Sequence, residues 1–163
     1  MTDFRALIEA LSKAQVRFVL VGGAAATVHG SSRLTQDIDI VYARDASNLA
    51  NLVHALSPLK PYLRGAPPGL PFKFDVQTLS RGLNFTFSTS VGDIDLLGEI
   101  AGIGDYEAMT GHTIEVAAFG ARFLCLDLAT LIKAKTAAGR PRDLEAIAEL
   151  RALQQEIEKR RGG

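Results

Sequence analysis

Residues 19–42 read VLVGGAAATVHGSSRLTQDIDIVY, and two short motifs stand out in this segment. The first is an apolar run, Phe18 to Val21, which stops at Gly22-Gly23. Such a run predicts a short buried strand followed by a tight turn. The second is Asp-Ile-Asp-Ile, at the start of a predicted strand from Asp37 to Tyr42. Because only a short helix and a loop separate them, adjacent strands could carry the two motifs.

The two aspartates of the second motif are expected to act together. Residues two apart on a strand point to the same face, so Asp37 and Asp39 project together while Ile38 and Ile40 enter the core. Like charges this close repel one another, which favours a counter-cation between them. Magnesium is the fitting ion, because it takes oxygen ligands and leaves positions for phosphate oxygens. The alternative is a pair of solvated aspartates at a strand edge.

A third carboxylate is expected from another strand. Residues 92–97 read GDIDLL and form the second strand of a predicted hairpin, whose first strand runs from Asn84 to Ser88. Asp93 and Asp95 share one face of that strand. Asp95 lies deeper in the strand, whereas Asp93 adjoins the turn and is expected to be solvated. We therefore predict Asp95 as the third ligand, with Asp93 as the alternative.

The glycine motif suits phosphate. Gly22-Gly23 directly precedes the predicted short helix, and glycine lets the backbone come close to a ligand. The free N–H groups and dipole at a helix start favour an anion there. Taken alone, this pattern is most often just a turn. Beside the Asp37/Asp39 pair, it predicts a turn that holds a triphosphate whose metal the carboxylates bind.

Periodicity and capping signals predict the remaining elements. They are helices at residues 4–14, 46–56, 128–138 and from Pro141 to about Lys159, and strands at 113–117 and 122–126. The proline-rich residues 57–71 are expected to form a loop. We predict an α/β (α+β) fold with a mixed sheet flanked by helices. One domain is expected to span residues 1–163, with the sheet in 1–126 and a helical C-terminal subregion in 127–160.

The composition describes an ordinary globular protein. The 163 residues are 47% hydrophobic, and 18 basic residues balance 18 acidic ones, so no broad positive field favours a long nucleic acid. The single cysteine, Cys125, is expected to be an inert core thiol rather than a reactive nucleophile. No long apolar run and no signal-peptide pattern is found, so we expect a cytoplasmic protein without a membrane partner.

Lys135 interrupts an apolar stripe on the predicted helix from Leu128. It lies on the same helix face as Leu131 and Ile132, whereas Lys133 points elsewhere. A lysine in that position either extends to the surface or balances buried negative charge. Next to three carboxylates and a triphosphate, we expect Lys135 to contact phosphate as a point charge.

Together, these residues resemble a known signature. Val21-Gly22-Gly23 followed by Asp37-Ile38-Asp39-Ile40 resembles the signature of the DNA polymerase beta-like nucleotidyltransferase superfamily. Residues 33–36, RLTQ, resemble the Arg-x-Thr-x-Asp-x-Asp run of small prokaryotic members, including those of toxin–antitoxin and abortive-infection loci. Residues 131–144, with Lys135 and Arg140, are also similar to that branch.

The resemblance implies transfer of a nucleoside monophosphate from a nucleoside triphosphate such as ATP to an acceptor hydroxyl. The acceptor would be a tRNA end, a protein side chain or a small molecule, and a cognate toxin or antitoxin would be a partner. Two Mg²⁺ ions would be held by Asp37, Asp39 and Asp95. The other residues implied at the site are Lys135 as a catalytic residue and Gly22, Gly23, Arg33 and Thr35 as nucleotide contacts.

Two positions depart from the family pattern. Many members have serine where this chain has Gly23, and Ala146 stands where that branch often has a second aspartate. These departures keep open an alternative of another class, a non-catalytic nucleotide-binding antitoxin or regulatory module of the same fold. A general phosphohydrolase is disfavoured, because no water-activating base is recognisable in the sequence.

Overall fold

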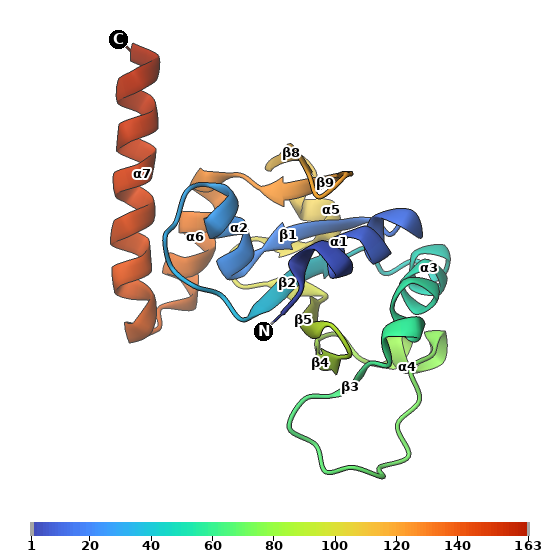
Figure 1. Cartoon of the computed structure of the whole chain (residues 1–163). Helices are drawn as coiled ribbons and strands as arrows, with labels where there is room; N and C mark the ends of the chain where they lie inside the picture. Colours follow the sequence, from blue (N-terminus) through green and yellow to red (C-terminus); the bar gives the residue numbers. More distant parts are fainter. Residues whose placement is uncertain (1, 163) are drawn as a thin grey trace.

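The computed structural model describes residues 2–162, apart from the side chain of Arg142. Its centre is a mixed sheet of seven strands, in the order β3-β4-β5-β2-β1-β9-β8 (Figure 1). The strands are β1 Phe18–Val21, β2 Asp37–Tyr42, β3 Tyr62–Leu63, β4 Phe85–Thr89, β5 Gly92–Leu97, β8 Thr113–Ala118 and β9 Ala121–Leu126. A separate small ribbon pairs β6 Glu99–Ile100 with β7 Gly104–Asp105. The expected mixed sheet is therefore confirmed.

Helices flank this sheet (Figure 1). They are α1 Phe4–Lys13, α2 Gly22–Val28, α3 Ala46–Leu56, α4 Val76–Arg81, α5 Tyr106–Met109, α6 Leu128–Ala138 and α7 Leu144–Gly162, with short 3₁₀ turns at Ser57–Leu59 and Pro141–Asp143. Helix α6 packs between α2 and α7, and the C-terminal part of α7 projects away from the sheet (Figure 1). Among the described helices, none is both long and apolar enough to cross a membrane.

Strand β2 is the centre of the sheet. It pairs antiparallel with β1 on one side and parallel with β5 on the other. The predicted hairpin is also present, because β4 pairs antiparallel with β5 across the turn at residues 90–91. The sequence motifs of β1, β2 and β5 therefore lie on three neighbouring strands.

The two faces of these central strands differ in chemistry. Ile38, Ile40, Ile94 and Leu96 are at most 1% exposed and belong to the hydrophobic core. The alternating aspartates of β2 and β5 are half-buried on the opposite face. Alternation of apolar and polar residues in 37–40 of β2 and 93–96 of β5 thus separates the core from a polar face.

Several boundaries differ from the expected ones, and three differences concern the glycine turn, the last helix and the proline-rich segment. Helix α2 begins at Gly22 rather than Ala24, so the glycines form its first turn. The last helix begins at Leu144, because Pro141 starts a 3₁₀ turn instead. The segment expected as a loop contains the two residues of β3, which pair with β4. The long connection after β3 extends away from the sheet (Figure 1).

Asn48 connects α3 to the ends of the two central strands. Its buried side chain accepts a hydrogen bond from the backbone N–H of Arg17 (2.7 Å). It also donates to the carbonyl groups of Ala43 (2.7 Å) and Arg17 (3.1 Å). Arg17 directly precedes β1 and Ala43 directly follows β2, so one amide holds both strands against the helix.

We expect Asn48→Ala to lower the free energy of unfolding by about 2 kcal/mol, because the backbone N–H of Arg17 and the buried carbonyl of Ala43 lose the side chain that they bond to. Urea denaturation monitored by circular dichroism measures this change. Asn51→Ala on the same helix is the control, since the Asn51 side chain makes a single long hydrogen bond within residues 2–162, 3.5 Å to the carbonyl oxygen of Gln15. Its effect should stay within about 0.5 kcal/mol, and similar losses for both variants would contradict the role of Asn48.

Candidate metal and nucleotide site

Three carboxylates meet on the polar face of the sheet. Asp37 and Asp39 come from β2 and Asp95 from β5, and one oxygen of each lies within 4.8 Å of the others. Parallel pairing places Asp39 beside Asp95 and Asp37 beside Asp93 in register. The structure therefore brings together the three acidic residues predicted from the sequence.

Asp93 lies next to this cluster and is not a member of it. Its side chain is 38% exposed, compared with 17% for Asp95. The difference follows the strand: Asp93 adjoins the turn, and Asp95 lies one pleat further into the sheet. These positions agree with the choice of Asp95 as the third acidic residue.

The absence of a side chain at Gly22 leaves room for the Asp39 carboxylate. The φ angle of Gly22 is +65°, a conformation that glycine adopts readily. A Cβ atom on Gly22 would lie 2.2 Å from Oδ2 of Asp39, so any side chain there would displace the carboxylate. The glycine turn therefore packs directly against the Asp39 carboxylate of the cluster.

Asp39 is electrostatically the most unusual member of the cluster. Burial, and next the negative charge of Asp37, raise the pKa of the Asp39 carboxyl from 3.8 to about 8. Burial and the charge of Asp95 also raise the pKa of Asp37. Oδ1 of Asp39 is buried and has no hydrogen-bond partner among the described residues. Carboxyls in this setting ionise readily only when a cation balances them.

The donor set fits a hard divalent cation. All candidate ligand atoms are carboxylate oxygens, which Mg²⁺ prefers, and they converge from two strands. The unpartnered Oδ1 of Asp39 supplies a buried acceptor that a cation would satisfy. Asp37, Asp39 and Asp95 are thus the residues that could hold a metal ion here.

Arg64 is a site residue that the sequence motifs do not reveal. It follows β3 and reaches three aspartates: Nη2 lies 2.8 Å from Asp95 Oδ1, Nη1 3.6 Å from Asp37 Oδ2, and Nε 3.5 Å from Asp93 Oδ2. In the sequence, Arg64 stands in a proline-rich segment with no motif around it. Only the pairing of β3 with β4 brings this arginine to the cluster.

A cleft of about 350 Å³ opens beside the cluster, and its volume lies within the range of small-ligand sites. Gly22, Asp39, Lys135 and Arg140 are among the residues that line it. Lys135 is half-buried, whereas Lys133 on the same helix is exposed. The cleft therefore combines a glycine turn, two acidic residues (Asp39 and Glu99) and two cationic side chains.

The remaining predicted nucleotide contacts surround a neighbouring hollow of about 210 Å³, which Lys135 also lines. Thr35 donates a hydrogen bond to the carbonyl of Asp37 (3.1 Å). A Cβ atom on Gly23 would lie 2.8 Å from the Thr35 hydroxyl, so these residues pack closely. Arg33 makes ion pairs with Glu145 (3.1 Å) and Glu149 (3.9 Å) of α7. In this structure, Arg33 therefore joins its loop to the last helix.

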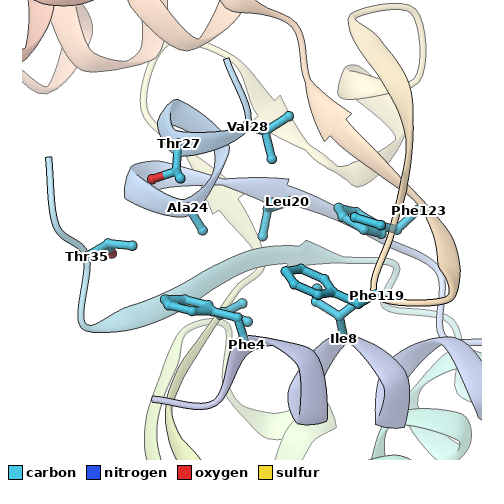
Figure 2. Close-up of a pocket in the computed structure, with 11 residues that line it drawn as sticks. Phe4, Ile8, Leu20, Ala24, Thr27, Val28, Thr35, Phe119 and Phe123 are labelled. Carbon is cyan, nitrogen blue, oxygen red and sulfur yellow. The ribbon is translucent and has the colours of Figure 1, made fainter. Parts of the chain in front are cut away.

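A further cavity, of about 190 Å³, has a different chemistry. Figure 2 shows Phe4 and Ile8 of α1 on one side of it and α2 on the other, with Phe119 and Phe123 of the β8–β9 hairpin beside them. None of its lining residues is charged. Because phosphate groups need charged or hydrogen-bonding partners, this cavity does not suit a triphosphate.

Comparison with solved structures identifies a similar fold. The crystal structure of a "putative nucleotidyltransferase" from Thermotoga maritima matches 93% of this chain and 90% of its own, with a TM-score of 0.57 and 17% sequence identity. This similarity shows a nucleotidyltransferase-like fold. No protein-family profile matches the sequence. No curated protein matches it either.

We expect Asp39→Asn to stabilise the protein in the presence of a chelator, and the gain should grow as pH rises. The folded-state pKa of Asp39, about 8, lies above its ordinary 3.8, so the folded protein keeps a proton that the unfolded chain loses. Wild-type stability therefore falls between these two pH values, while the variant lacks this loss. Urea denaturation of both proteins from pH 4 to pH 8 measures it. If the difference in free energy of unfolding between the two proteins does not change with pH, the raised pKa of Asp39 is contradicted.

Proposed function

We propose that this protein transfers a nucleoside monophosphate from a nucleoside triphosphate to an acceptor hydroxyl. The observation that carries the proposal is the cluster of Asp37, Asp39 and Asp95, built against the Gly22 turn. The nucleotidyltransferase-like fold and the resemblance of residues 19–42 to that superfamily support it.

The triphosphate would lie in the cleft between the glycine turn and α6. Val21, the residue before α2, provides no side-chain hydrogen bond to the helix start, so the first N–H groups of α2 are left for phosphate oxygens. Lys135 lines the same cleft as Gly22 and Asp39, where its ammonium group would balance phosphate charge. Arg33 and Thr35 would contribute from the neighbouring hollow.

Asp37, Asp39 and Asp95 would hold two magnesium ions, because their carboxylate oxygens are the ligands that Mg²⁺ prefers. When bound, the ions would supply positive charge to the triphosphate and make the acceptor hydroxyl easier to deprotonate. The protein contributes rigidity: two strands in register hold the three side chains.

In the proposed reaction, the acceptor oxygen forms a bond to the α-phosphorus while the bond from that phosphorus to its bridging oxygen breaks. Pyrophosphate leaves, and the acceptor proton passes to a base. We assign Asp95 to assist this deprotonation. It lies on β5, across β2 from the strand that leads into the glycine turn, and the acceptor would approach from this side of the cluster, opposite the proposed triphosphate.

Three kinds of acceptor provide a suitable hydroxyl: a tRNA end, a serine or tyrosine of a partner protein, and a small molecule. The resemblance of residues 33–39 to members from toxin–antitoxin loci makes a cognate partner protein the first to test. The assay incubates the purified protein with Mg²⁺, each α-labelled triphosphate, starting with ATP, and cell extract. Label is then sought separately in RNA, protein and small molecules.

Lys135→Ala should reduce transfer by about 100-fold, as expected when a charge that stabilises the reacting phosphates is removed. Lys133→Ala is the matched control and should retain wild-type activity, because Lys133 is exposed and lines neither the cleft nor the neighbouring hollow. Initial rates with saturating acceptor provide the measurement. Equal losses in the two variants would exclude the proposed contact of Lys135 with phosphate.

Asp95→Asn should still bind magnesium–nucleotide within several-fold of wild type yet lose transfer by at least about 100-fold. Asp93→Asn, on the same face of the same strand, should remain within a few-fold of wild type, because Asp93 lies outside the cluster. Calorimetry measures binding, and label transfer measures activity. Nucleotide binding by the wild type with no labelled acceptor in any fraction would favour the non-catalytic binding module instead.

A further inference from the structure

Arg64 places a positive charge at the edge of the carboxylate cluster. Its guanidinium contacts Asp95 (2.8 Å) and Asp37 (3.6 Å), which are two of the three proposed metal ligands. It reaches Asp93 (3.5 Å) as well, whereas no contact with Asp39 is found. One side chain thus forms ion pairs with three of the four aspartates, and Asp39 is the one with which it does not pair.

The position of Arg64 is built into the sheet. Its backbone N–H donates to the carbonyl of Thr86 (3.0 Å), continuing the pairing of β3 with β4. Its Nη2 group also donates to the carbonyl of Phe87 (2.9 Å). The side chain is only 28% exposed. Backbone and side chain are therefore both anchored on β4, unlike those of a mobile surface arginine.

We propose that Arg64 is an internal counter-ion, which a divalent cation must displace from Asp37 and Asp95 when it binds the cluster. Arg64 then sets the metal affinity of the site. This inference rests on the proposed function, because it assumes that the cluster binds metal. A guanidinium and a divalent ion held by the same carboxylates repel each other, so each weakens the hold of the other.

The structure also provides a place for the displaced arginine. Asp93 lies outside the cluster and is more exposed than Asp95, and the Phe87 carbonyl faces the same guanidinium. In the metal-bound protein, the guanidinium would give up Asp37 and Asp95 and stay beside Asp93, whose Oδ2 already lies 3.5 Å from Nε.

Binding of Mn²⁺ alone, followed by electron paramagnetic resonance without nucleotide, tests this inference. Arg64→Met should bind Mn²⁺ at least about 10-fold more tightly than wild type, because the competing charge is gone. Arg122→Met is the matched control: it removes one positive charge from an exposed pair with Glu115 and should change affinity less than two-fold. Asp39→Asn should weaken binding in both the wild-type and Arg64→Met backgrounds, which locates the ion in the cluster.

The outcomes separate this inference from the proposed function. Equal or weaker Mn²⁺ binding by Arg64→Met, with clear binding by the wild type, overturns the counter-ion role and leaves the metal site intact. If neither protein binds Mn²⁺, the metal site itself fails, and the proposed function fails with it. If Arg64→Met does not fold, Arg64→Gln replaces it, because it removes the positive charge and keeps a polar, hydrogen-bonding group at this half-buried position. Arg64→Gln must then bind Mn²⁺ at least about 10-fold more tightly than wild type.

Discussion

The in-register parallel pairing of β2 with β5 is the interaction on which the rest of the candidate site depends. It places Asp39 beside Asp95, although like charges on adjacent strands repel and partial burial makes that repulsion worse. The pairing holds because the same two strands bury Ile38 and Ile94 on their other face. Apolar packing on the core face of the sheet thus holds the carboxylates together on its polar face.

Two neighbours adapt to this concentration of charge. Gly22 leaves open the space that the Asp39 carboxylate occupies, so the turn that would approach phosphate also shapes the acidic cluster. Arg64 supplies a positive charge from the other side of β2 and β5, because it follows β3 and is held against β4. The cluster therefore lies between the backbone of Gly22 and the guanidinium of Arg64. In this setting an exchangeable cation can be held.

The C-terminal helices add the cationic side of the site. Lys135 of α6 lines both the cleft beside Asp39 and the hollow beside Gly23. Helix α7 secures the loop before β2, because Glu149 accepts hydrogen bonds from Ser31 and Ser32 and pairs with Arg33. Packing of α6 against α2 and α7 thus couples distant parts of the chain at one site.

The sequence by itself determined the elements whose signals are local. The glycine turn after β1, the shared face of Asp37 and Asp39, and the deeper position of Asp95 all follow from strand alternation and turn chemistry. The order of the strands, the parallel register of β2 with β5, and Arg64 at the cluster were decided only by the tertiary structure. They depend on pairing between segments far apart in the chain, and residue spacing carries no record of which strands pair. Arg64 belongs to a proline-rich segment without periodicity, and it becomes a site residue because β3 pairs with β4.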